Sequence, residues 1–146
     1  MLRYTCEIEN LTKAHSTDAG YDLRSIEDLT IKANCSSTIN TGCCVEIPKG
    51  FVGIVKGRSG MTFKSHTEVC NAGVIDSDYR GEIKVKIHNL NDYDLNITRG
   101  ERIAQMIILP CFLENAERVD SLGETERGSN GFGSTGKNWF FLCFII

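Results

Sequence analysis

Alternation of apolar and polar positions is the dominant pattern along this chain. Residues 82–88 read Glu-Ile-Lys-Val-Lys-Ile-His, so every second side chain is apolar. A period of two predicts a strand with one buried face. Residues 2–8 repeat this pattern, and residues 51–55 follow the turn signal Pro-Lys-Gly and form another predicted strand. Residues 103–109 are an apolar run between a glycine and a proline, which predicts a more buried strand.

Helical periodicity is nearly absent, and residues 62–68 can supply only one or two helical turns. Short strands separated by Gly, Asn and Asp clusters predict an all-β fold, a sandwich or barrel of antiparallel sheets with one short helix. Residues 123–136 are rich in Gly, Ser and Thr and cannot bury enough apolar surface to order themselves. We therefore expect a folded body at residues 1–122 and a flexible C-terminal arm at residues 123–146.

Composition limits the class of protein. With 146 residues, 41% apolar residues and 24% charged residues, the chain fits a single globular domain. A net charge of −3 gives no basic footprint for binding nucleic acid. The N-terminus lacks the apolar stretch of a signal peptide, so we expect an intracellular protein, cytoplasmic or nuclear.

The seven cysteines are odd in number and include no C-x-x-C pair. Free buried thiols in a reducing compartment are therefore expected, rather than a disulfide framework. The chain ends in an apolar run at residues 139–146, too short to span a bilayer, which takes about 20 helical residues. We expect this tail to pack on the body or on a neighbouring subunit. A partner-binding or membrane-surface anchor is the alternative.

Five segments are too polar or too rich in glycine for the strand pattern around them. They are residues 19–25, 57–61, 71–82, 100–107 and 127–136. Each is weak alone: Asp22, for instance, fits an ordinary turn. The third segment places seven polar or small residues between Val74-Ile75 and Ile83, which predicts a hairpin with an unusually polar turn. The fifth fits G-x-G-x-x-G but has no following helix, so only its capacity to cradle phosphate oxygens remains.

Together, the five segments resemble the five motifs of the dUTP pyrophosphatase family, in the same order and spacing. The third (G-V-I-D-S-D-Y-R-G) and the fifth (R-G-S-N-G-F-G-S-T-G) are the most specific. Met61-Thr62 and Asn130 depart from the usual motifs but remove no group that the chemistry needs. The resemblance implies a β jelly-roll homotrimer with active sites shared between subunits, in which the fifth motif comes from another subunit's arm.

The resemblance also implies roles for individual residues. Asp76 would orient and activate the attacking water. Phosphate-binding residues would be Arg58, Ser59, Gly60, Gln105, Arg127, Ser134 and Thr135. Residues that bind uracil and deoxyribose would be Asn71, Gly73, Ile75, Tyr79, Phe132 and Gly133. Mg²⁺ would be held mostly by phosphates and water, with Asp22 as an outer-shell ligand acting through water.

The implied reaction is hydrolysis of dUTP to dUMP and pyrophosphate, which keeps uracil out of DNA and supplies dUMP for thymidylate synthesis. The implied partners are dUTP and further copies of the chain, with no nucleic acid and no membrane. Two alternatives stay open. A dCTP deaminase shares the fold but usually shows Arg-Ser-Ser where this chain has Arg58-Ser59-Gly60. A non-enzymatic binding protein could use the same fold, with the apolar tail as its contact.

Overall fold

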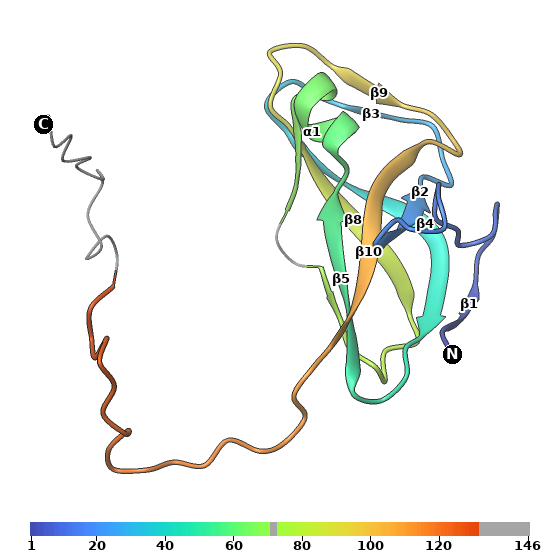
Figure 1. Ribbon diagram of the computed structural model, residues 1–146. Helices are drawn as coiled ribbons and strands as arrows, with labels where there is room; N and C mark the ends of the chain where they lie inside the picture. Colours follow the sequence, from blue (N-terminus) through green and yellow to red (C-terminus); the bar gives the residue numbers. More distant parts are fainter. Residues whose placement is uncertain (71–72, 132–146) are drawn as a thin grey trace, which may run out of the picture. The chain divides into compact units, whose positions relative to one another are not determined.

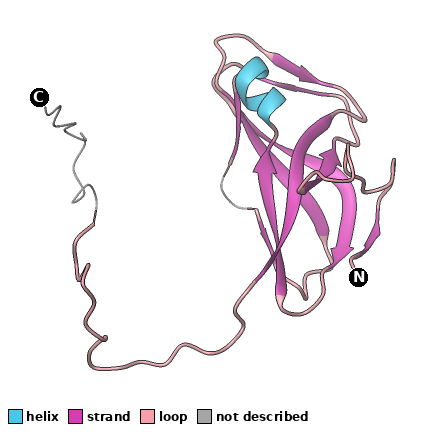
Figure 2. Ribbon diagram, viewed as in Figure 1, coloured by secondary structure: helices cyan, strands magenta, loops and turns pink. Residues whose placement is uncertain are grey.

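Two four-stranded sheets and a two-stranded sheet make up the fold, with one short helix (Figures 1 and 2). The computed structural model describes residues 1–70 and 73–131. One sheet has the order β1 (Arg3–Thr5), β4 (Ser36–Glu46), β8 (Glu82–Asn89), β6 (Thr67–Val69). The other has the order β2 (Gly20–Arg24), β10 (Arg102–Pro110), β5 (Phe51–Gly57), β7 (Val74–Ile75). The small sheet pairs β3 (Leu29–Ile31) with β9 (Leu95–Ile97), and the helix is α1 (Ser59–Ser65).

All strand pairs are antiparallel. The predicted all-β class with one short helix is therefore confirmed. Among the described residues, no helix is long and apolar enough to cross a membrane.

The alternating segment forms β8, the most regular strand. Ile83, Val85 and Ile87 are 0%, 1% and 0% exposed, whereas Lys84 and Lys86 point to solvent. Burying each such aliphatic side chain is worth about 1.5–3 kcal/mol, so the three residues fix which face of β8 turns inward. The predicted strand at residues 82–88 is confirmed.

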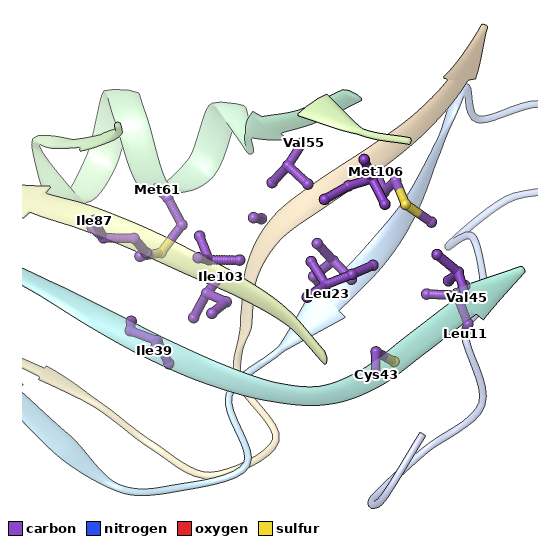
Figure 3. Packing of buried hydrophobic residues seen from close by; sticks show 14 of the residues in the cluster. Leu11, Leu23, Ile39, Cys43, Val45, Val55, Met61, Ile87, Ile103 and Met106 are labelled. Atoms are coloured by element: carbon purple, nitrogen blue, oxygen red, sulfur yellow. The ribbon is translucent and has the colours of Figure 1, made fainter. Parts of the chain in front are cut away.

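Side chains from both large sheets fill one core (Figure 3). This core includes Leu23 on β2, Met106 on β10, and Ile39 and Val45 on β4, and all four are at most 2% exposed. This packing holds the strands that carry the polar segments in a fixed register.

Strand β10 is buried only at its start. Ile103 and Met106 are 0% exposed, but Leu109 is 45% exposed. The reason is the pairing: β10 lies between β2 and β5 as far as Ile107 and beyond it pairs with β5 alone. The prediction of a buried strand over residues 103–109 is correct for its first half.

Two elements differ from the predictions. The helix lies three residues earlier than expected, because His66 adopts a left-handed conformation (φ 46°) that ends it. The segment at residues 19–25, judged too polar for a strand, contains β2. As an edge strand β2 pairs only with β10, so a single buried hydrophobic side chain, that of Leu23, is enough to anchor it.

The prediction of a hairpin at residues 74–83 is also wrong. β7 pairs with β5, whereas β8 pairs with β4 and β6 in the other sheet. The polar residues 76–81 therefore connect the two sheets. This explains why the connection is longer and more polar than a hairpin turn.

The expectation that all cysteines are free buried thiols is wrong. Cys6 and Cys43 form a disulfide across 37 residues of sequence, because β1 pairs with β4 and brings their Cα atoms to 4.2 Å. Among the cysteines that the structure describes, four are free, and none of these is buried: Cys35 is exposed, and the other three (Cys44, Cys70 and Cys111) are partly exposed. Cys143 lies outside the described residues.

The chain divides into two units, Met1–Leu113 and Glu114–Ile146. Within the second unit, residues 114–131 contain no helix or strand and are almost entirely exposed. A local turn is present where Gly128 donates its N–H to the carbonyl of Thr125 at 3.0 Å. The predicted body at residues 1–122 and arm at residues 123–146 stay predictions, and the apolar tail lies outside the described residues.

Candidate active site

A buried carboxylate and two arginines meet where three neighbouring strands, β2, β10 and β5, come together. Asp22 lies on β2, Arg102 begins β10, and Arg58 follows β5 directly. The Asp22 Oδ1 atom is 3.0 Å from Arg58 Nε, and its Oδ2 atom is 3.3 Å from Arg102 Nη1. The Asp22 side chain is only 10% exposed, so its charge needs a partner, and these two guanidinium groups supply it.

Arg58 is fixed by a second contact. Its Nη1 donates to the carbonyl oxygen of Arg102 at 3.2 Å, while its Nε faces Asp22. The Arg58 side chain is 27% exposed, so part of the guanidinium still reaches solvent. A guanidinium held in this way is suited to bind a phosphate oxygen.

A cavity of about 210 Å³ adjoins this cluster. Its lining residues are Ala14, Asp18, Ala19, Gly20, Asp22, Arg58, Ser59 and Gln105. The Gln105 amide donates to the carbonyl of Gly57 at 3.0 Å, and a Cβ atom at Gly20 would lie 2.5 Å from Gln105 Oε1. Glycine at position 20 therefore makes room for the Gln105 side chain, which lines the cavity.

The structure thus brings together Asp22, Arg58, Ser59 and Gln105, and places Gly60 next to them on α1. It adds Asp18, which the sequence analysis did not single out. The backbone N–H of His15 donates to Asp18 at 2.9 Å and, as the main cause, lowers the pKa of this carboxyl below its ordinary value. The signal that could have identified Asp18 is its position directly before the Ala-Gly of the first segment.

A second cavity, of about 290 Å³, lies against the connection between β7 and β8. Its lining residues are Val74, Ile75, Asp76, Tyr79, Glu82, Ile83 and Lys84. Asp76 is exposed, and its carbonyl accepts a turn hydrogen bond from the Tyr79 N–H at 3.2 Å. Asp76 also borders a wider groove of about 720 Å³ beside Phe51 and Arg80.

Close packing holds the start of this connection on β5. Val55 donates its N–H to the Gly73 carbonyl at 2.7 Å, and a Cβ atom at Gly73 would lie 2.6 Å from Val55 Cβ. Ile75 is 9% exposed and pairs with Gly53. Gly73 and Ile75 therefore fix the backbone that leads to Asp76.

The two cavities share no lining residue. Ile75 pairs with Gly53, and Arg58 follows five positions further along the same extended chain. At about 3.3 Å per residue, these positions are about 16 Å apart. A single copy of the chain does not bring Asp76 together with Arg58.

The remaining predicted site residues fall outside the described residues or in the second unit. Asn71, Phe132, Gly133, Ser134 and Thr135 lie outside the described residues. Arg127 belongs to the second unit, where its Nε donates to the carbonyl of Asn130 at 2.9 Å.

The residues around Asp22 fit a metal ion only through water. Among residues 1–70 and 73–131, no group of three or more His, Cys, Asp or Glu side chains could hold a metal ion. Both oxygens of Asp22 already contact an arginine, although a carboxylate oxygen can accept more than one hydrogen bond. A magnesium ion bound through its own waters, which Asp22 would orient, matches this arrangement better than direct ligation.

Comparison with known proteins places this geometry in a class, the nucleotide hydrolases with an antiparallel β fold. The sequence profile of the dUTPase family matches residues 7–136. A deoxyuridine 5'-triphosphate nucleotidohydrolase of Corynebacterium jeikeium is 43% identical over 141 residues, which cover 93% of this chain and 91% of that protein. One from Nautilia profundicola is 46% identical over 132 residues, covering 88% and 93%.

Solved structures agree. The dUTPase of Staphylococcus bacteriophage 80alpha with dUpNHpp matches with a TM-score of 0.87 at 30% identity, covering 94% of this chain and 99% of that one. A mutant dUTPase of the S. aureus phage phi11, described for its coordination of a structural Mg(II) ion, has a TM-score of 0.77 at 25% identity, covering 83% and 97%. The chain belongs to the dUTPase family and is accordingly a dUTP diphosphatase, a hydrolase.

Proposed function

We propose that this chain converts dUTP to dUMP and pyrophosphate by metal-assisted attack of water on the α-phosphate, at sites completed by neighbouring copies in a homotrimer. In the cell this reaction would keep uracil out of DNA and supply dUMP for thymidylate synthesis. The observation that carries the proposal is the occurrence, in a dUTPase-family chain, of two separate half-sites. One is the polar cavity around Arg58, and the other is the cavity around Asp76.

Phosphate binding is assigned to the first cavity. Arg58 offers charged donors, Ser59 a hydroxyl and Gln105 an amide, and all three line the same space of about 210 Å³. Gly60 adds a backbone with no heavy atom within 4 Å of a would-be Cβ, so a phosphate oxygen can approach its main chain closely. From the arm, Arg127, Ser134 and Thr135 would add further donors. Such fixed donors stabilise the charge that grows on the leaving pyrophosphate.

Water activation is assigned to Asp76. Its carboxylate is exposed at the mouth of the second cavity, where it can accept a proton from a water placed in line with the α-phosphorus. The bond between this water oxygen and phosphorus forms as the bond to the bridging oxygen of pyrophosphate breaks. A magnesium ion, when bound to the triphosphate and through water to Asp22, would offset the negative charge of the phosphates.

Base and sugar recognition are assigned to the β7–β8 connection. Main-chain groups from Asn71 to Ile75, with Gly73 pinned on β5, would pair with the uracil edge. Tyr79 would lie against the deoxyribose and leave no room for a 2′-hydroxyl. Phe132 and Gly133 of the arm would close over the base, and base stacking on an aromatic ring is worth about 1–3 kcal/mol.

The test is a substrate panel with a matched variant. Purified protein and its Asp76→Asn variant are incubated with dUTP, dCTP, dTTP or UTP and Mg²⁺, and pyrophosphate and ammonia are measured. We expect pyrophosphate from dUTP only, and a fall in kcat of about 10²–10⁴-fold in the variant, the usual contribution of a general base. Binding of a non-hydrolysable dUTP analogue should persist in the variant, because the change keeps the shape of the side chain.

Three results would contradict the proposal. Ammonia release from dCTP would indicate a deaminase instead. Analogue binding with no pyrophosphate release by the unmodified chain would indicate a binding protein. Near-normal turnover of Asp76→Asn would remove Asp76 from the base role. Chelation of divalent ions with EDTA, followed by Mg²⁺ addition, tests the metal requirement separately.

A further inference from the structure

Gly81, which is not among the predicted site residues, has no room for a side chain. A Cβ atom built on it would lie 2.4 Å from the Tyr79 hydroxyl oxygen, 2.6 Å from Tyr79 Cζ and 3.0 Å from Tyr79 Cε2. All three of these nearest atoms belong to the same phenol ring. The ring of Tyr79 therefore folds back over the backbone of residue 81.

The backbone conformation gives no other reason for glycine at this position. In the described part of the chain, the glycines with positive φ are Gly42, Gly50, Gly100 and Gly128, and Gly81 is not among them. Any L-residue could adopt the backbone of residue 81 if the phenol ring were absent. The absence of a Cβ atom at Gly81 thus leaves the space that the Tyr79 ring occupies.

A second contact fixes the same ring. The Tyr79 hydroxyl donates to the backbone carbonyl of Glu82 at 3.0 Å. Glu82 is itself held, because its Oε1 accepts from the Gly42 N–H at 2.8 Å and its Oε2 lies 3.8 Å from Lys84 Nζ. The phenol is therefore anchored at its tip by Glu82 and supported along its edge by Gly81, although Tyr79 is 45% exposed.

We propose that Gly81 is a positioning residue that sets the Tyr79 ring and thereby the discrimination between deoxyribonucleotide and ribonucleotide triphosphates. This inference rests on the proposed function, in which Tyr79 lies against the sugar. An exposed tyrosine with two free torsions could turn away and admit a 2′-hydroxyl. The packing on Gly81 and the hydrogen bond to Glu82 hold it in the one orientation that lines the cavity with Asp76.

A methyl group at position 81 should displace the ring and leave the fold intact. The close atoms all belong to the Tyr79 side chain and none of them is backbone, so the ring can move aside by giving up its hydrogen bond to Glu82. Steric rejection of one small group is worth about 10- to 200-fold in kcat/KM. Gly81→Ala should therefore lower the ratio of kcat/KM for dUTP over UTP by about tenfold or more.

The experiment is a double-mutant cycle. The dUTP/UTP ratio of kcat/KM is measured for the unmodified protein, Gly81→Ala, Tyr79→Ala and the double variant. We expect both single variants to lose discrimination and the double variant to match Tyr79→Ala, because Gly81 acts only through the ring. Tyr79→Phe, which keeps the packing on Gly81 but removes the hydrogen bond to Glu82, should lose less discrimination than Gly81→Ala.

A structural measurement accompanies the kinetics. Incorporation of 3-fluorotyrosine labels the four tyrosines, and in ¹⁹F NMR the Tyr79 signal should move in Gly81→Ala while the signals of Tyr4, Tyr21 and Tyr93 stay in place. An unmoved Tyr79 signal overturns the inference even if the variant is poorly active.

The outcomes separate the two claims. If Tyr79→Ala relaxes discrimination but Gly81→Ala does not, or if Gly81→Ala lowers kcat/KM for both substrates in equal proportion, the role of Gly81 is refuted and the proposed function stands. If Tyr79→Ala keeps full discrimination, the sugar contact assigned to Tyr79 is refuted, and the inference about Gly81 fails with it.

Discussion

Asn89 shows how much of the scaffold depends on single polar side chains. It is 0% exposed at the end of β8, and its amide nitrogen lies 3.1 Å from the Ile31 carbonyl and 2.8 Å from the Tyr93 carbonyl. Its Oδ1 accepts from both nitrogens of Asn91, at 3.0 Å and 2.7 Å. One side chain thus ties the small β3–β9 sheet to the large sheet that contains β8.

Replacing Asn89 by Ala should destabilise the protein by about 2–4 kcal/mol, because buried carbonyl and N–H groups would lose their partners together. The measurement is the free energy of unfolding in urea. Asn96→Ala is the matched control: this residue, on β9, accepts a hydrogen bond from Thr30 at an exposed position, so its loss should change stability by no more than about 0.5 kcal/mol. Equal effects of the two substitutions would contradict the role given to Asn89.

At the scale of the element, helix α1 carries an unusual end. Its last residue is followed by His66 at φ 46° and ψ 53°, a left-handed conformation normally taken by glycine, and the His66 N–H closes the helix on the Met61 carbonyl. The cavity around Arg58 is bordered by the start of this helix, at Ser59, and not by its end. The sequence thus gives no glycine stop signal for a helix that nevertheless ends here.

His66→Gly should raise the free energy of unfolding by about 0.5–1 kcal/mol. The left-handed conformation costs an L-residue about 1–2 kcal/mol, and part of this gain is offset by the greater freedom of glycine in the unfolded chain. His66→Ala removes the exposed side chain but keeps the strained backbone, so it should give no gain. Stabilisation by Ala as large as by Gly would place the effect in the side chain instead.

The elements that sequence reasoning could predict are those in which burial is decided within the strand itself. The alternation of β8 and the apolar run of β10 are visible because each strand packs against the core with its own side chains. Strand β4 was not predicted, since its first half is rich in Ser and Thr and its burial comes from lying between β1 and β8. Long-range pairing of this kind leaves no local signal.

The same distinction applies to the candidate site. Asp22, Arg58, Ser59 and Gln105 could be grouped from their motifs, and the structure brings them to one cavity. The supporting contacts could not be predicted from the sequence. The ion pair of Arg102 with Asp22 depends on strand register, and the packing of Tyr79 on Gly81 depends on the path of one connection. Roles that require a second chain were expected only from the family resemblance, and a single copy does not test them.

At the scale of the whole molecule, the proposed function treats the two cavities of each copy as two half-sites. The cavity around Arg58 has polar donors for phosphate but not Asp76, and the cavity around Asp76 has the tyrosine but not the arginine. Because about 16 Å of strand separates them, one copy cannot apply both to the same phosphorus. In the proposed homotrimer, cyclic symmetry would solve this problem, since each interface would join one cavity of a copy to the other cavity of its neighbour.

Shared sites predict that two inactive variants restore each other. Asp76→Asn and Arg58→Ala should each be nearly inactive alone, but equal amounts refolded together should recover about a quarter of the normal activity. A site is intact only when one copy supplies an unsubstituted Asp76 and its neighbour supplies an unsubstituted Arg58, and each condition holds in about half of the cases (~0.5 × 0.5). Both chains keep their arms, so only the two cavities differ.

A chain with both substitutions, mixed with Asp76→Asn, supplies no Asp76 and should stay inactive. If the first mixture also stays inactive although mixed assemblies form, as shown by tandem purification on two different tags, each site must lie within one copy. Recovery near one quarter therefore identifies the interface between copies as the place where water and phosphate meet.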